Sequence, residues 1–122
     1  IRKNTDLFET DKITPELIFD VANKIVEKLN PEKIILFGSH ARGDANEYSD
    51  LDILVVMKTD LPRFKRAGLV SNLIRPRFFS ADFKVYTPFE FGKAEKNLDP
   101  WFDIFIKEVL EDGKILYDGK AK

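Results

Sequence analysis

Asp50 and Asp52 are two aspartates separated by one residue at the start of an apolar run, and their carboxylates are the strongest candidates for a chemical role in this chain. Side chains two positions apart on a strand point to the same face. Two carboxylates held that close repel each other unless a cation lies between them. Hard oxygen ligands of this kind suit Mg²⁺, which takes substrate phosphates as further ligands. The simpler interpretation of an isolated Asp-x-Asp is two solvated aspartates.

Gly38 and Ser39 strengthen the chemical interpretation, because they end another apolar run and precede Asp50 by ten intervening residues. A glycine at a strand end lets the backbone approach a ligand closely. If a helical turn begins at Ser39, its N–H groups and hydroxyl form an anion site. Phosphate beside a metal is what phosphoryl or nucleotidyl transfer requires. An ordinary strand-to-loop turn stays open as the alternative for Gly-Ser alone.

The elements that must position these pairs follow from hydrophobic periodicity. Apolar residues at helical spacing predict a helix over 15–29, with Thr14 as its N-cap. The apolar runs 34–37 and 51–57 predict two strands that are buried on both faces. The glycine-serine pair then ends one strand and the aspartate pair begins the next. The polar residues 1–13 are expected to be a mobile arm or part of the first helix.

The second half of the chain alternates helical and extended patterns. A strong helix is expected to begin with Asp99 as N-cap and to end at Gly113 in the left-handed conformation. Its expected buried face is Trp101, Phe102, Phe105, Ile106, Val109 and Leu110. The other expected elements are a helix over 62–75 with Phe64, Ala67, Leu73 and Ile74 inside, a strand over 78–86, a short helix within 88–97 and a strand over 114–117. This order predicts an α/β (α+β) fold, a small mixed sheet with helices packed on it.

Length and composition limit the class of protein. The 122 residues predict one domain over 1–122, and 43% hydrophobic residues, with eleven Phe, suffice for one modest core. The net charge of −1 argues against direct nucleic-acid binding, which usually needs a basic domain. The absence of Cys excludes disulfides and thiolate metal sites and favours a cytoplasmic location. No apolar run is long enough for a membrane span.

The pattern Gly-Ser, ten residues, Asp-x-Asp resembles the signature of the polymerase-beta-like nucleotidyltransferase superfamily. The local sequence GSHARGDANEYSDLDILVV resembles its minimal nucleotidyltransferase (MNT) branch, and the likeness extends to FKVYTP and EDGKILYDG. Other phosphate motifs, G-x-x-x-x-G-K-[ST] and G-x-G-x-x-G, are absent, and an EF-hand fails at Ser49 and Val55. The resemblance implies a mixed sheet and a site where three carboxylates hold two Mg²⁺ ions.

The resemblance also implies a role for each residue of the motif. Gly38 and Ser39 would hold the phosphates of a nucleoside triphosphate, with ATP as the substrate. Asp50 and Asp52 would bind the metals. The third carboxylate belongs on the strand before Thr-Pro, where Asp82 fits best; it would bind a metal and accept the proton of the attacking hydroxyl. The alternatives for Asp82 are a surface carboxylate or a salt bridge with Lys84, two residues on.

Basic residues around the motif have two interpretations each. Arg42 either contacts the triphosphate or the attacking group, or orients its loop by pairing with Asp44 or Asp50. His40 is expected to be a loop residue and not a catalytic base. The basic residues within 62–77 predict a solvated helix face, with a docking surface for an acidic partner or an RNA as the alternative.

Stand-alone domains of this type resemble the antitoxins of HEPN–MNT toxin–antitoxin pairs. That resemblance implies AMP transfer from ATP to a tyrosine of a HEPN-domain protein, an RNase toxin that the transfer silences. The R-x₄₋₆-H motif of the toxin is absent, so this chain would be the transferase. Two alternatives stay open: a non-catalytic binding subunit, and a small-molecule nucleotidyltransferase of the aminoglycoside type. A homo-oligomer is also compatible with the sequence.

Overall fold

The computed structural model describes residues 10–96 and 103–120, which include a four-stranded mixed sheet. The strands lie in the order β3-β2-β1-β4. They are β1 (Lys33–Phe37), β2 (Leu51–Val56), β3 (Ala81–Tyr86) and β4 (Lys114–Asp118). Strand β1 pairs antiparallel with β2 and with β4, whereas β3 pairs parallel with β2. The carboxylate-bearing strands β2 and β3 are therefore neighbours that run in the same direction.

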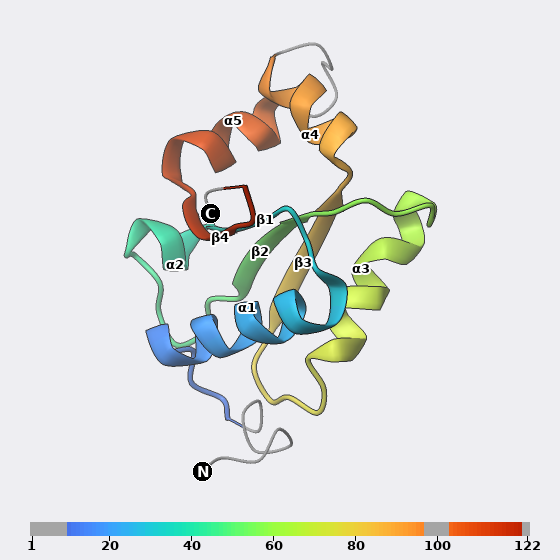
Figure 1. The fold of residues 1–122 in the computed structure, drawn as a ribbon. Helices are drawn as coiled ribbons and strands as arrows, with labels where there is room; N and C mark the ends of the chain where they lie inside the picture. The colour runs from blue at the N-terminus through green and yellow to red at the C-terminus, as the bar shows by residue number, and fades with distance from the viewer. Residues whose placement is uncertain (1–9, 97–102, 121–122) are drawn as a thin grey trace.

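Helices cover both faces of this sheet (Figure 1). They are α1 (Pro15–Leu29), α2 (Ser39–Arg42), α3 (Arg63–Leu73), α4 (Pro88–Glu95) and α5 (Asp103–Asp112). Helices α1 and α3 pack on one face, and α4 and α5 pack on the other. The short α2 follows β1 directly and lies at one end of the sheet. In the described part of the chain, no helix combines the length and apolar character that a membrane span requires.

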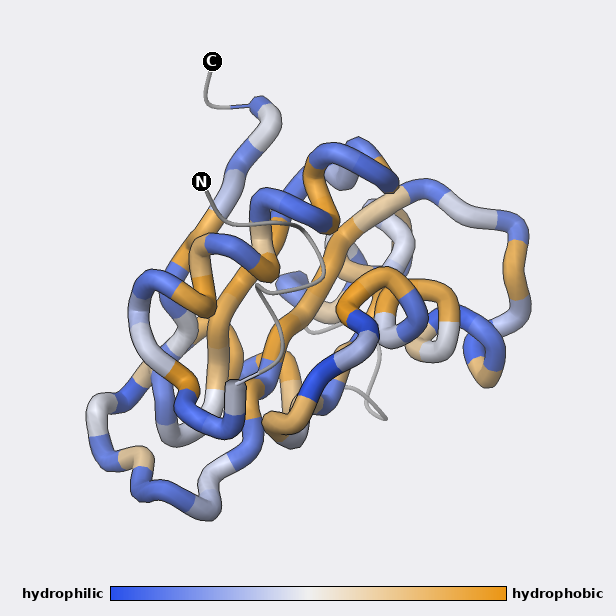
Figure 2. The backbone as a smooth tube through the Cα atoms, turned by 90° about the horizontal axis from the view of Figure 1, so that it is seen from below, coloured by the Kyte–Doolittle hydropathy of each residue, from blue (hydrophilic) through white to orange (hydrophobic). Residues whose placement is uncertain are grey.

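Strand β2 has apolar side chains on both faces, as the continuous apolar run predicts. Leu51, Ile53 and Val55 are fully buried under α1 and α3. Leu54 and Val56 point the other way, toward α4 and α5. Burying one such side chain stabilises a fold by roughly 1.5–3 kcal/mol, and the hydrophobic strands run through the middle of the molecule (Figure 2). The alternation places Asp52 on the face of α4 and α5.

The first helix forms where the sequence predicts it. The hydroxyl of Thr14 accepts a hydrogen bond from the backbone N–H of Leu17 at 3.1 Å, which satisfies one free donor of the first turn. Asn30 ends the helix in the left-handed conformation, with φ of 48°. Residues 10–14 precede the helix and do not extend it, while residues 1–9 lie outside the described part. The prediction of β1, β2 and β4 is confirmed to within one residue at each end.

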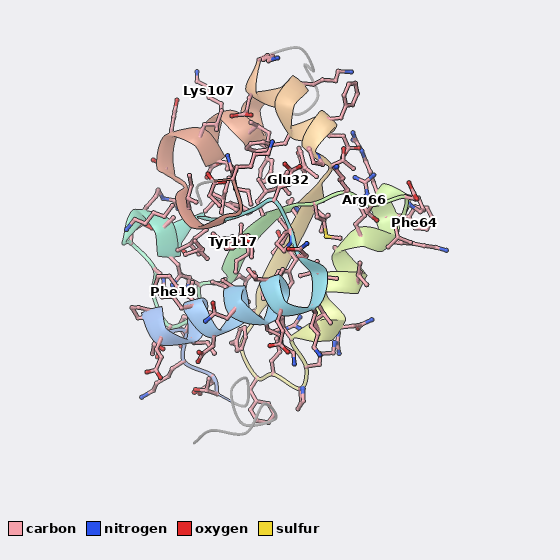
Figure 3. The ribbon with its side chains drawn as sticks, viewed as in Figure 1. Phe19, Glu32, Phe64, Arg66, Lys107 and Tyr117 are labelled. Atoms are coloured by element: carbon pink, nitrogen blue, oxygen red, sulfur yellow. The ribbon has the colours of Figure 1, made fainter. Side chains whose placement is uncertain are left out.

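The predictions for helix α3 and strand β3 need correction. Strand β3 begins at Ala81, and not at residue 78, so that Phe78 lies before it and is exposed. On α3 the buried positions are Arg66 and Val70, whereas Phe64 points away from the fold with 82% of its surface exposed (Figure 3). The apolar side chains of this helix do not form one stripe, so periodicity could not define its buried face.

Gly113 does not adopt the predicted left-handed conformation, since the described glycines with positive φ are Gly38 and Gly43. Strand β4 begins at the next residue, which requires an extended path. A Cβ at position 113 would overlap the backbone oxygen of Val109 and lie 2.8 Å from Ile35 Cγ2, so glycine is required where the end of α5 approaches β1. On α5, Ile106 and Val109 are buried as expected, but Leu110 is half exposed. The predictions for Asp99, Trp101 and Phe102 lie outside the described residues.

Candidate active site

The end of β1 turns directly into helix α2, as the glycine-serine pair predicts. Gly38 has φ of 76° and ψ of −158°, a conformation that favours glycine strongly. Its carbonyl accepts the N–H groups of Ala41 and Arg42, both at 3.1 Å, and thereby begins the helical turn. The first N–H groups of such a turn have no partner within the helix. Ser39 therefore begins this helical turn directly after β1, at the end of the sheet.

Asp52 lies against this turn from the neighbouring strand. It pairs in register with Phe37, the residue before Gly38. A Cβ on Gly38 would overlap Asp52 Oδ2 and lie 3.1 Å from Asp52 Cγ. The carboxylate thus occupies the space that any other residue at position 38 would need, so Gly38 and Asp52 are closely packed.

A second carboxylate stands beside Asp52 on the parallel strand. Asp82 of β3 pairs in register with Asp52, which places the two on one face. Partial burial raises the pKa of Asp52, and the negative charges of Asp82 and Asp50 raise it further. Asp50 itself precedes β2 and is exposed. The structure therefore brings the three predicted carboxylates near enough to interact, with Asp52 at their centre.

Asp82 already has a cationic partner. Lys84 Nζ lies 3.3 Å from Asp82 Oδ2, which is the salt bridge that the sequence left as an alternative. Within residues 10–96 and 103–120, no group of three or more His, Cys, Asp or Glu side chains is arranged to hold a metal ion. The donor chemistry and the strand register fit a hard cation, because Asp50, Asp52 and Asp82 are all carboxylates. Burial raises the pKa of Asp52, the negative charges of Asp82 and Asp50 raise it further, and a cation would offset these charges. The ligand geometry for that cation is not preformed.

The loop between the turn and Asp50 is held by side chains near the motif. Arg42 lies 3.3 Å from Asp44 and 3.3 Å from Glu108 of α5, so it joins α2 to α5. Its pairing with Asp44 confirms one of the two interpretations, and its contact with a triphosphate stays a prediction. His40 lies in α2 and not in the loop as expected, and its Nε2 lies 3.4 Å from the carbonyl oxygen of Ser49 in that loop.

Basic residues of α3 have structural partners that the sequence analysis missed. Arg66 is buried and contacts Glu90 of α4 at 2.7 Å, so the prediction of a solvated helix face is wrong at this position. Arg63 contacts the same carboxylate at 3.2 Å. Glu90 also accepts the backbone N–H of Thr87 at 2.8 Å in a capping box. The Thr-x-x-Glu spacing was a signal for this box, but no local pattern points to Arg66 as its partner.

Comparison with known proteins agrees with the geometry. The model of the nucleotidyltransferase domain family matches residues 20–114. Two relatives from Methanocaldococcus jannaschii carry the name "Putative protein adenylyltransferase". One, MJ0604, is 35% identical over 70% of this chain and 78% of its own length. The other, MJ0141, is 40% identical over 47% of this chain and 54% of its own length, so the match spans about half of that relative.

Two crystal structures share the fold. A nucleotidyltransferase structure from Sulfolobus solfataricus has a TM-score of 0.57 at 24% identity, over 86% of this chain and 80% of that one. A toxin–antitoxin structure with AMP-PNP has a TM-score of 0.52 at 20% identity, over 84% and 75%. At these identities the structures support the mixed-sheet fold alone. The family match over most of the chain, together with MJ0604, shows that this chain belongs to the nucleotidyltransferase domain family.

Proposed function

We propose that this protein transfers AMP from ATP to a hydroxyl group with the help of Mg²⁺, and that the acceptor is a tyrosine of a partner HEPN-domain protein. The single observation that carries the transfer is the fit of the Asp52 carboxylate against Gly38. Nucleotidyl transfer needs a phosphate-holding turn beside metal-binding carboxylates. Asp52 at the start of β2 lies close against Gly38 at the end of β1, and this placement supports the proposed roles.

In the proposed site, Gly38 and Ser39 hold the phosphates, and Asp50, Asp52 and Asp82 would hold two Mg²⁺ ions. When bound, the ions would offset the charge of the phosphates and of the three carboxylates. To ligate an ion, Asp82 must turn from Lys84, which lies 3.3 Å away. The raised pKa of Asp52, caused first by burial and then by Asp82 and Asp50, supports a place for positive charge there.

The proposed reaction is an in-line displacement at the α-phosphorus of ATP. The acceptor oxygen forms a new bond to that phosphorus while the bond to the bridging oxygen of the β-phosphate breaks. The bonding electrons leave with pyrophosphate, and the acceptor proton passes to the carboxylate of Asp82. The side chains of the site contribute mainly position and electrostatic stabilisation. Arg42, beside the turn on α2, would contact the triphosphate after leaving Asp44 or Glu108.

The names of similar proteins support the proposed acceptor and the proposed partner. Two relatives are named as protein adenylyltransferases, which favours a protein acceptor over a small molecule. The structure with AMP-PNP belongs to a toxin–antitoxin complex, which agrees with the sequence resemblance to HEPN–MNT antitoxins. A second candidate, a subunit that neutralises its partner by contact alone, is favoured by one observation: the ion pair of Asp82 with Lys84 already neutralises one of the three carboxylates.

A thermal-shift measurement separates the two candidates. Ligand that binds only the folded state raises the melting temperature by linkage. We expect ATP with Mg²⁺ to raise it for the natural protein and to leave Asp52→Asn unchanged. Incubation with labelled ATP and the product of the neighbouring gene should then label a tyrosine of that product. An unchanged melting temperature with every nucleoside triphosphate would favour the contact-only subunit instead.

A further inference from the structure

A cavity of about 460 Å³ lies on the outer side of β3. Its described lining comes from α3, β3, α4 and α5: Arg63, Ala67, Phe83, Lys84, Val85, Tyr86, Glu90 and Phe105. The volume falls in the usual range for ligand pockets, roughly 300–1,000 Å³. The nucleotide site proposed above uses none of these residues, so the cavity is available to a different ligand.

Lys84 links the cavity to the carboxylate site. The same side chain that lines the cavity lies 3.3 Å from Asp82 and 5.9 Å from the centre of the Phe105 ring. Phe105 also packs near Tyr86, with ring centres 6.2 Å apart, and edge-on to Phe37 at 5.2 Å. An occupant of the cavity beside Lys84 would therefore have the carboxylate of Asp82 as its neighbour.

The order of the strands indicates which substrate enters here. Gly38 ends β1, Asp52 lies on β2 and Asp82 on β3, and the cavity lies beyond β3. In an in-line displacement the attacking and leaving groups lie on opposite sides of the phosphorus. If the departing phosphates are held at Gly38, the attacking hydroxyl must approach from the side of β3. The cavity lies on that side, which favours the acceptor over the triphosphate as its occupant.

We propose that this cavity binds the aromatic ring of the acceptor side chain and thereby selects a phenolic hydroxyl over an aliphatic one. The aliphatic and aromatic walls, Val85, Ala67 and Phe105, suit a flat apolar ring. Lys84 lines the cavity and contacts Asp82, so the acceptor hydroxyl would lie at the Lys84 end of the cavity. An aliphatic hydroxyl such as that of serine would leave the apolar walls in contact with water. This inference rests on the proposed transfer reaction.

The test measures binding without nucleotide, by NMR of the methyl groups of Ala67 and Val85. N-acetyl-tyrosinamide should shift both signals in a saturable way, whereas N-acetyl-serinamide should leave them unchanged. The variant Ala67→Phe, at an exposed helix position, fills the cavity and should weaken tyrosinamide binding at least about tenfold. Ala67→Val should have a smaller effect in the same direction. Lys65→Phe adds the same ring on the same helix outside the cavity and should bind as the natural protein does.

Three outcomes would overturn the inference: no saturable shift, equal shifts with serinamide, or tyrosinamide binding that Ala67→Phe leaves intact. Displacement of tyrosinamide by AMP-PNP from these methyl groups would also overturn it, because the cavity would then hold the nucleotide base. The failure of the transfer reaction looks different. In that case tyrosinamide still binds, but ATP with Mg²⁺ produces no thermal shift in the natural protein.

Discussion

Lys84 and Asp82 form an ion pair of 3.3 Å on one face of β3, where the proposed function requires Asp82 to hold a metal. The lysine ammonium therefore competes with the cation for the same carboxylate. Both side chains are about half exposed, and pairs of this kind contribute about 0.2–1 kcal/mol. The pair is weak enough to open when a divalent ion with two or three carboxylate ligands is offered.

Replacing this lysine should strengthen metal binding. We expect Lys84→Met to raise the affinity for Mn²⁺, used as a probe of the Mg²⁺ site, by roughly two- to fivefold, the factor that corresponds to the energy of such an ion pair. Isothermal titration calorimetry measures it. Lys107→Met, on an exposed position of α5 (Figure 3), removes an equal charge away from the site and should change little. A lower affinity in Lys84→Met would show that Asp82 is not a metal ligand.

Any side chain at position 38 should disturb both the fold and the nucleotide site. Gly38→Ala places a Cβ in the space of the Asp52 carboxylate and requires a positive φ. We expect a loss of about 1–3 kcal/mol in the free energy of unfolding, from backbone strain alone. Urea unfolding measures this loss, and the thermal shift with ATP and Mg²⁺ should disappear. Gly68→Ala is the matched control, because a Cβ on that helical glycine meets no atom within 4 Å.

The control has an expected sign of its own. Alanine in a helix interior is more stable than glycine by roughly 0.5–1 kcal/mol, so Gly68→Ala should stabilise the protein and leave nucleotide binding intact. If Gly38→Ala were as stable as the natural protein, the contact between position 38 and Asp52 would not constrain the turn.

Much of the secondary structure could be predicted because it depends on local patterns. The stripe of α1, its Thr14 cap and the apolar runs of β1 and β2 all lie within short windows of sequence. The placement of Asp52 beside Gly38 could be anticipated for a different reason, the resemblance of the motif to a known family. Periodicity by itself does not determine the strand order, so the sequence could not predict that Asp52 pairs in register with Asp82.

Contacts between distant segments could not be predicted. Arg66 is buried, and its guanidinium donates to Glu90, 24 residues later, at 2.7 Å as well as to the nearby carbonyl oxygen of Leu61 at 2.9 Å. Phe64 is exposed although an aromatic side chain suits a core. The buried side of α3 carries Val70, and Phe64 lies outside it. The cavity also depends on four elements that meet at β3. Pairings of this kind depend on the packing of whole elements, and no local window of sequence contains both partners.

Removing the charge of Asp52 should stabilise the protein in the absence of metal. Burial, Asp82 and Asp50 raise the pKa of Asp52 above its ordinary value of 3.8, so the folded state binds this proton more tightly than the unfolded chain. The charged form therefore lowers stability above the folded pKa, and this effect disappears below about pH 3.8. Asp52→Asn should melt at a higher temperature than the natural protein at pH 7, in buffer with EDTA.

The difference should shrink as the pH falls through the pKa of Asp52, because the natural side chain then also becomes neutral. Calorimetric scans between pH 3 and pH 7 measure it. With ATP and Mg²⁺ at pH 7 the order should reverse, since only the natural protein gains from the ligand. A variant that melts lower than the natural protein without metal would contradict the charge repulsion at this site.

Glu90 should stabilise the fold with the opposite pH dependence. Partial burial alone would raise its pKa, but the N–H of Thr87 and the guanidinium of Arg66 outweigh burial and lower it. Because its pKa is lowered, the charged Glu90 side chain stabilises the fold above the ordinary pKa of 4.5, and this stabilisation is lost as the pH falls through the folded pKa.

Glu90→Gln leaves the buried Arg66 without a charged partner and should cost about 1–3 kcal/mol of unfolding free energy at pH 7. Urea unfolding at pH 7 and pH 3.5 measures both effects. The exposed Glu95→Gln on the same helix should change stability by less than about 0.5 kcal/mol, and an equal loss in the two variants would mean that the contact of Glu90 with Arg66 does not hold α3 to α4.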